Sequence, residues 1–192
     1  QLVFGDDSRK KYEFIFEQVK EIKRLCDAYG IQFLASVFDE EKLEWCEKLN
    51  VSSYKIASRT LLKDSALCKK IINTGKPVLA SLGMWPDNDN PPYTDPNISY
   101  LRCISKYPTS IMDLKDFRFG RSTVLGGDWF EIAGLSDHSY GICNAMYAIA
   151  HGAKVIEKHF TLDKSMDGND HVGSMVMDEL MVLSTYGREL DR

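Results

Sequence analysis

The segment FEIAGLSDHSYGICNAMYAIAHGAKVIEKHF, residues 130–160, holds a strand, a helix and a second strand in order. Two short runs rich in β-branched and aromatic residues, FEIAGLS and AKVIEKHF, flank a helical stretch spanning residues 140–151. This order is typical of a βαβ unit, in which a helix crosses between two parallel strands. The segment therefore predicts a parallel sheet that is covered by helices.

The same alternation extends through the rest of the chain. Further strands are predicted in QFLASVF, SSYKIAS, KPVLASLG and SYLRCIS. Helices are predicted from the N-cap candidate Ser8 to the terminator Gly30, from Asp39 to Leu49, and over residues 63–74 and 177–190. Residues 86–98 contain PDNDNPPYTDPN, which predicts a long loop at the C-terminal end of a strand.

Six strands spaced roughly 20 to 30 residues apart suit either a doubly wound sheet or a β/α barrel. A nucleotide-binding sheet would show a glycine-rich fingerprint after its first strand, whereas Gly83 and Gly141 stand alone. The favoured fold class is therefore α/β, a (β/α)8 TIM-type barrel. Because 192 residues fall short of the roughly 250 that a complete barrel needs, we expect a partial barrel.

Composition limits the classes of partner. The chain is 44% hydrophobic and 27% charged, and its net charge of -4 gives no electrostatic reason to expect nucleic acid. No run approaches the roughly 18 apolar residues that cross a bilayer, and no secretion signal begins the sequence. The five cysteines are odd in number and form no CxxC pair, so they indicate neither a disulfide framework nor a zinc knuckle. We expect a cytoplasmic protein that binds small molecules.

Side chains alternate along a strand, so one parity faces the barrel interior. In most of the predicted strands one parity starts apolar and carries polar residues toward the C-terminal end, where barrel enzymes place their active sites. The residues of this parity are Leu34, Ser36 and Phe38; Lys55 and Ala57, with Ser58 directly after; Leu79, Ser81 and Gly83; Leu101, Cys103, Ser105 and Tyr107; Ile132, Gly134, Ser136 and His138; and Val155, Glu157 and His159.

Two inward histidines end adjacent strands, His138 and His159. Imidazole binds divalent cations, and two protein ligands leave positions for substrate oxygens or water, which favours catalytic Mn2+ or Mg2+ over structural zinc. The alternative is a pair of polar residues at strand ends. Asp137 has the wrong parity to be a ligand. Glu157 could orient a ligand from behind, or form a buried ion pair with Lys55.

Lys55 together with Ser36, Ser58, Ser81 and Ser105 supplies one cation and several hydroxyl donors, as expected around a phosphate or carboxylate. Serines at strand ends are also common turn formers. After the last strand, a polar loop with Asp170 and His171 is expected to cross the mouth of the site, although such a loop could equally be a solvated turn.

The segments FLASVFD, YKIAS, GKPVLASLGM, CISKYPTS, GLSDHSYGI and GAKVIEKHFTLDKSMDGNDH occur in this order. In this order they resemble the signature segments of the N-acetylneuraminate (sialic acid) synthase family. The resemblance implies a β/α barrel that condenses phosphoenolpyruvate with an N-acetylated mannosamine-type sugar, releasing phosphate and forming a nine-carbon 2-keto acid. It also implies a homodimer in the full-length protein.

The resemblance implies a role for each matching residue. His138 and His159 would be the ligands of an ion that acts as a Lewis acid on the sugar aldehyde. Asp170 matches a position that binds sugar hydroxyls. The positions that hold phosphoenolpyruvate in the family are matched by Ser36, Lys55, Ser58, Ser81, Tyr107 and Ser136.

This chain departs from the family pattern in three respects. Thr60 stands where a glutamate is expected to handle a proton or water, so the acid/base group is open. Ser105 stands where asparagine is common, and Arg102 where histidine is common. By this comparison the first two barrel strands and the C-terminal antifreeze-like domain would lie outside the chain, leaving two sheet edges to be covered.

Two other functions stay open at this point. The chain could be a catalytically inactive barrel that binds a sugar or a partner protein, as Thr60 and the missing strands would permit. It could also be another metal-dependent barrel enzyme, such as an aldolase or isomerase, because the histidines alone do not distinguish these reactions.

Overall fold

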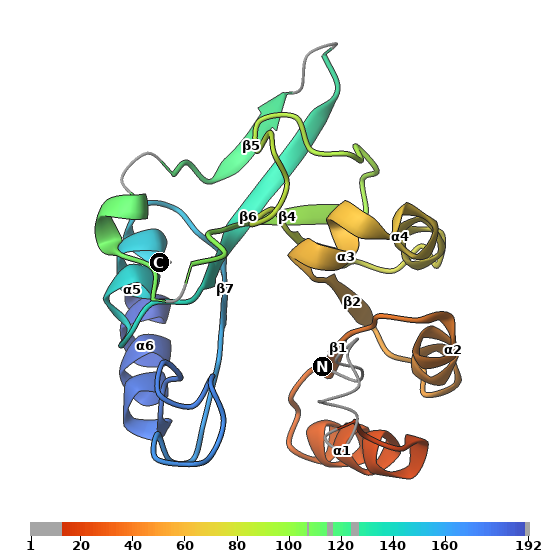
Figure 1. Cartoon of the computed structure of the whole chain (residues 1–192), viewed down its shortest axis with the longest axis horizontal. Coiled ribbons are helices and arrows are strands. Elements are labelled where there is room, and N and C mark those ends of the chain that lie inside the picture. The colour runs from red at the N-terminus through yellow and green to blue at the C-terminus, as the bar shows by residue number, and fades with distance from the viewer. Residues whose placement is uncertain (1–12, 107, 115–116, 124–126, 191–192) are drawn as a thin grey trace. The chain divides into compact units, whose positions relative to one another are not determined.

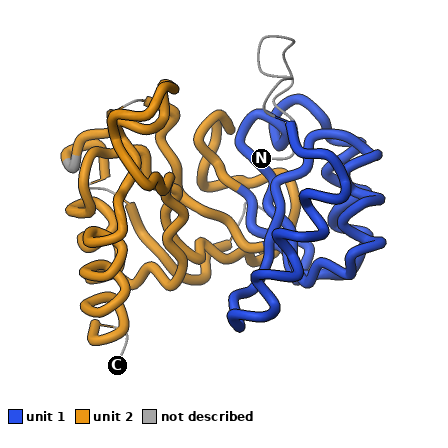
Figure 2. Tube along the Cα trace, turned by 90° about the horizontal axis from the view of Figure 1, so that it is seen from below, with its two compact units in different colours: residues 1–80, 95–98 blue, residues 81–94, 99–192 orange. Residues whose placement is uncertain are grey.

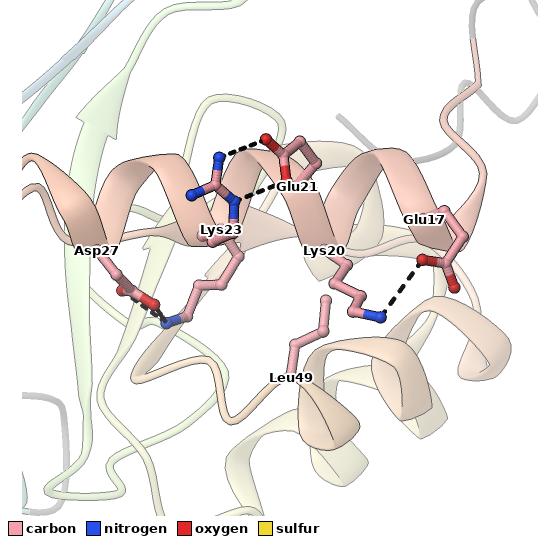
Figure 3. A pocket seen from close by; sticks show the side chains of 7 residues that line it. Glu17, Lys20, Glu21, Lys23, Asp27 and Leu49 are labelled. Atoms are coloured by element: carbon pink, nitrogen blue, oxygen red, sulfur yellow. Dashed lines mark hydrogen bonds and ion pairs between the residues drawn. The ribbon is translucent and has the colours of Figure 1, made fainter.

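The computed structural model describes residues 13–106, 108–114, 117–123 and 127–190. The chain forms two compact units, which are coloured separately in Figure 2. Unit 1 holds residues 1–80 and 95–98, and unit 2 holds residues 81–94 and 99–192.

Unit 1 alternates strands and helices. Its β1 strand pairs in parallel with β2, and β2 pairs in parallel with β3. The register sets Ser36 beside Lys55 and Lys55 beside Leu79, so these residues share one row and one face. In chain order the elements are α1 Phe16–Ala28, β1 Leu34–Ser36, α2 Glu40–Lys48, β2 Ser53–Ile56, α3 Ser58–Lys63, α4 Ser65–Ile72 and β3 Val78–Ser81 (Figure 1).

The opposite face of β2 packs toward the helices. Tyr54 and Ile56 are fully buried, and the Tyr54 hydroxyl donates a 2.5 Å hydrogen bond to Glu47 of α2. The predicted start of α2 is confirmed, because the Asp39 side chain accepts a hydrogen bond from the Lys42 N–H. By contrast Leu34, on the inward row of β1, is 40% exposed.

Unit 2 is organised around its longest strand, β6. Strand β4 pairs with β6 in parallel and so does β7, whereas β5 pairs with it antiparallel. The elements are β4 Ile98–Cys103, whose first residue falls in unit 1, the 3-10 helix Ile111–Leu114, β5 Gly120–Thr123, β6 Trp129–Asp137, α5 Cys143–Ala150, β7 Val155–Lys158 and α6 Met177–Leu190 (Figure 1). Ile156 of β7 packs against α5 and α6, as its outward parity predicts.

A β-bulge in β6 overturns one assignment made from strand parity. Tyr100 pairs with Ile132, but the next residue, Leu101, pairs with Gly134, so Ala133 is an extra residue. Ile132 was predicted to share a face with Gly134, Ser136 and His138. This is wrong for Ile132, which lies in the row of Tyr100, because an extra residue exchanges the faces of the strand.

All six predicted strands are confirmed, and residues 82–97 form neither helix nor strand, as the loop prediction requires. Three short elements were missed: β5, α3 and the 3-10 helix Ile111–Leu114. Strand β5 has the sequence GRST, with no apolar alternation, and α3 is too short to show a helical period. The helix predicted at 63–74 begins at Ser65 because the Asp64 side chain caps the Leu67 N–H.

The first helix begins at Phe16, and Ser8, its predicted N-cap, lies outside the described residues. Gly30 ends that helix with φ +67°, a left-handed conformation in which the Ile31 N–H bonds to the Cys26 carbonyl. Within the described parts of the chain, no helix combines the length and apolar character needed to cross a membrane.

Candidate metal and substrate site

The ends of β6 and β7 bring the two predicted histidines together. The last pair in the register is Asp137 with Lys158, and His138 and His159 follow directly. Their ring centroids lie 5.7 Å apart with the rings tilted by 55°. Because parallel strands end at the same edge of a sheet, the register itself produces this proximity.

His138 is half-buried. The Cys103 Sγ lies 3.8 Å from its Nδ1, and its carbonyl accepts a hydrogen bond from the Thr109 N–H. Burial lowers the pKa of His138 below 6.5, and the neighbouring His159 lowers it further. A lowered pKa keeps the imidazole neutral near pH 7, which is the form that binds metal ions. An ion held through Nε2 would preserve the thiol contact at Nδ1.

A pocket of about 160 Å³ opens beside the histidines. The loop after β7 forms part of its wall, so the structure brings Asp170 to the same pocket as His138 and His159. The Asp170 carbonyl accepts a hydrogen bond from the Ser174 hydroxyl, which holds this part of the loop. The lining residues are Pro108, Asp137, His138, Tyr140, His159, Asn169, Asp170, Val172 and Gly173.

His171, the other histidine of that loop, does not line the pocket. Its Nδ1 lies 2.7 Å from the Thr161 hydroxyl, at the start of the same loop. This contact ties the two ends of the loop together, so His171 shapes the segment that carries Asp170.

Below the histidines, the inward row of unit 2 is polar and buried. Ser136 pairs in register with Cys103 on one side and with Glu157 on the other. The Ser81 hydroxyl lies 3.4 Å from the Glu157 carboxylate, and Ser81 and Ser136 are almost fully buried. The structure therefore assembles Ser81, Ser136 and Glu157 as one polar group, as their shared parity predicts.

Ser105 lies at the rim and is exposed. A Cβ atom placed on Gly83 would lie 2.7 Å from the Ser105 hydroxyl and 2.6 Å from the Cys103 Sγ. A side chain at position 83 would therefore have to displace the side chains of Cys103 and Ser105 at the end of β4.

Unit 1 holds a second group of predicted site residues. Lys55 is 4% exposed and donates a 3.0 Å hydrogen bond from Nζ to the Ile56 carbonyl. Ser36 lies next to it in the register, and Ser58 is the first residue of α3, directly after the strand. Thr60, in place of the expected glutamate, is buried in the same helix. Tyr107 lies outside the described residues.

Strand parity missed Lys158 and Ser139. Asp137 faces away from the histidine row, as predicted, and there it forms an ion pair with Lys158 that also involves the Ser139 backbone. The sequence does contain a signal for this pair, because one histidine follows an aspartate and the other follows a lysine at equivalent strand positions.

The donors present fit one divalent ion shared between the histidines. With their ring centroids 5.7 Å apart, His138 and His159 would be the two protein ligands of such an ion. Within the described ranges, no cluster of three or more histidine, cysteine, aspartate or glutamate side chains is placed to hold a metal. A site on this pair would therefore complete its shell with water or substrate oxygens.

A family model named NeuB family matches residues 6–192. The chain belongs to the NeuB family. N-acetylneuraminate-9-phosphate synthase of Homo sapiens is 32% identical over 192 residues, covering 97% of this chain and 53% of the relative. Pseudaminic acid synthase of Campylobacter jejuni is 32% identical over 200 residues, covering 96% and 57%. The chain thus spans about half the length of these relatives, and the resemblance seen in the signature segments is confirmed.

Solved structures agree with this membership. The N-acetylneuraminic acid synthetase of Leptospira borgpetersenii, crystallised with citrate, is 26% identical with a TM-score of 0.78, covering 97% of this chain and 68% of that one. DAHP synthase of Thermotoga maritima, 16% identical with a TM-score of 0.64 over 93% and 56% of the two chains, bears on the fold alone. The fold class is α/β with a largely parallel sheet, a partial barrel of the TIM type, as predicted.

Proposed function

We propose that the protein carrying this chain condenses phosphoenolpyruvate with an N-acetylmannosamine-type sugar and water. The products are a sialic acid-like nine-carbon 2-keto acid and phosphate. The observation that carries the proposal is the pocket that His138, His159 and Asp170 line together in a chain of the NeuB family.

In this proposal His138 and His159 would hold Mn2+ or Mg2+, which would supply a Lewis acid for the sugar aldehyde. Asp170 is assigned the binding of sugar hydroxyls beside them, because it lines the same pocket as the two histidines. The contact between the Cys103 thiol and Nδ1 of His138 supports this arrangement, since it orients one ring.

Phosphoenolpyruvate is proposed to bind through Lys55 and a set of hydroxyls. The buried ammonium of Lys55 supplies positive charge, and its neighbours Ser36 and Ser58 supply donors. Ser81, Ser105 and Ser136 keep their proposed role in binding phosphoenolpyruvate through the family resemblance, and Glu157 orients Ser81 through their contact. Tyr107 keeps its proposed role through the family resemblance. Lys158, which directly precedes His159, forms an ion pair with Asp137 and is not part of this set.

The test is phosphate release from phosphoenolpyruvate in the presence of Mn2+ and either N-acetylmannosamine or its 6-phosphate. We expect release that depends on the sugar. The absence of release with every mannosamine derivative, from a protein that is folded, would show that the chain is a binding module. Turnover of the sugar without phosphoenolpyruvate would point to an aldolase or isomerase.

Site variants separate the metal from the phosphoenolpyruvate part of the proposal. His138→Ala and His159→Ala are expected to abolish phosphate release and weaken Mn2+ binding while leaving the fold intact. His151→Ala is the matched control, because His151 is an exposed histidine at the end of α5 that stacks on Tyr147. Lys55→Ala is expected to raise the KM for phosphoenolpyruvate chiefly; a change confined to the KM of the sugar contradicts its assigned role.

We also propose that the full-length protein is a homodimer, as the resemblance implies. Sedimentation equilibrium checks this, and a monomer at every accessible concentration contradicts it.

A further inference from the structure

An ion pair lies buried directly behind the two histidines. Asp137 and Lys158 are the last register partners of β6 and β7, and their Oδ2 and Nζ atoms lie 2.8 Å apart. Each side chain is only 1% exposed. The pair lies on the face of the strands opposite to the one that carries His138 and His159, since side chains alternate.

The pair also fastens the peptide groups around His138. The other carboxylate oxygen of Asp137 accepts a 2.9 Å hydrogen bond from the Ser139 N–H, and Lys158 Nζ donates a 2.7 Å bond to the Ser139 carbonyl. The backbone directly after His138 is thus held by charged groups, one of which, Lys158, directly precedes His159.

These contacts do more than hold two strands together. Burying two charges is expensive, and apolar side chains of the same size would join β6 and β7 at least as well. Charge-assisted hydrogen bonds differ from apolar packing because they are short and directional. Here the Asp137 carboxylate accepts from the Ser139 N–H and the Lys158 ammonium donates to the Ser139 carbonyl. The pair therefore sets the path of the chain as it leaves β6.

We propose that Asp137 and Lys158 are positioning residues for the metal site, setting the separation and tilt of the His138 and His159 rings through the backbone. They contact neither metal nor substrate themselves. The inference rests on the proposed function, which places the ion between these histidines.

Two variants that keep the shape of the pair test this role. Lys158→Met retains the length of the side chain and loses the ammonium, and Asp137→Asn retains an oxygen for the Ser139 N–H and loses the charge. The matched control is Lys76→Met in unit 1, which removes a 2.7 Å ion pair with Glu47 far along the sequence from the histidines. Mn2+ titrations followed by electron paramagnetic resonance measure the dissociation constant in each folded protein.

We expect Lys158→Met and Asp137→Asn to weaken Mn2+ binding by about 10-fold or more, the usual effect of losing the groups behind a metal ligand. Lys76→Met should leave the affinity within about twofold of the parent, whatever it does to the melting temperature. A readout that needs no metal is amide hydrogen exchange at Ser139, which should accelerate in Lys158→Met and not in Lys76→Met.

In turnover, the positioning role predicts a lower kcat and a higher Mn2+ requirement with an unchanged KM for phosphoenolpyruvate. If Lys158→Met does not fold, the double variant Asp137→Asn with Lys158→Met removes both charges together and is expected to fold and bind Mn2+ weakly. Parent-like Mn2+ affinity in the double variant overturns the proposal. Failure of the proposed function is a different result, in which the parent itself binds no Mn2+ that His138→Ala or His159→Ala removes.

Discussion

Replacing Gly134 with alanine should separate β7 from β6. A Cβ atom at this position would lie 1.7 Å from the Val155 carbonyl oxygen and 2.6 Å from its carbonyl carbon. These are backbone atoms of the register partner of Gly134, so no side chain can rotate away. The oxygen would have to retreat to at least 3.0 Å, and the strand with it.

The magnitude follows from two costs. Forcing an extra carbon into a packed site costs about 1–3 kcal/mol, and losing the hydrogen bonds on either side of Val155 costs about 0.5–1.5 kcal/mol each. Gly134→Ala should therefore lower the free energy of unfolding by on the order of 2–6 kcal/mol. For a chain of this length that corresponds to a fall in melting temperature of about 10 °C.

Urea unfolding followed by circular dichroism measures the change. The matched control is Gly187→Ala in α6, where the nearest contact is the flexible Ile149 Cδ1 at 3.2 Å and alanine favours the helix. We expect that variant to stay within about 1 kcal/mol of the parent. An equally small change in Gly134→Ala would refute the close approach of β6 and β7, and with it the register that brings the histidines together.

Three further predictions concern the metal site and the helices. Cys103→Ser shortens the group that contacts Nδ1 of His138 and should weaken Mn2+ binding about 10-fold without loss of stability; an unchanged dissociation constant means that the thiol does not orient the ring. Because burial lowers the pKa of His138 below 6.5, the unfolded chain binds more protons than the folded one just below that pH. The free energy of unfolding of the metal-free protein should therefore decrease as pH falls from 6.5 through the lowered pKa of His138. The His138→Gln variant should lack this part of the pH dependence in urea titrations. Asp39→Ala removes the cap on the Lys42 N–H and should cost about 1 kcal/mol of stability by the same method, with Mn2+ affinity unchanged; no loss of stability would show that water replaces the cap.

Strand positions and the histidine pair could be predicted because both follow from local alternation. A strand that is buried on one face shows an alternation of apolar and polar residues in the sequence. The carboxyl ends of parallel strands lie at the same edge of the sheet. His138, His159 and Asp170 therefore meet where the sequence places them. Short elements such as β5 carry too few residues to show a period.

The bulge at Ala133 could not be predicted, for a different reason, and the contacts of Lys158 were missed although an aspartate and a lysine precede the two histidines at equivalent strand positions. A bulge depends on pairing with strands that are distant in sequence. The residues around Ala133 show no pattern that predicts an extra residue in the strand. Lys158 has the parity that faces the helices, where a lysine normally reaches solvent. Its burial follows only from the position of Asp137 across the register.

Ala133 also marks a change of neighbours along one edge of β6. Residues 129–132 pair with β5, residues 134–137 pair with β7, and the Ala133 carbonyl itself accepts the Lys154 N–H. The bulge thus divides β6 into two segments that pair with different strands along this edge. A change in the pairing of residues 129–132 with β5 therefore need not alter the pairing of residues 134–137 with β7, which leads into the histidines.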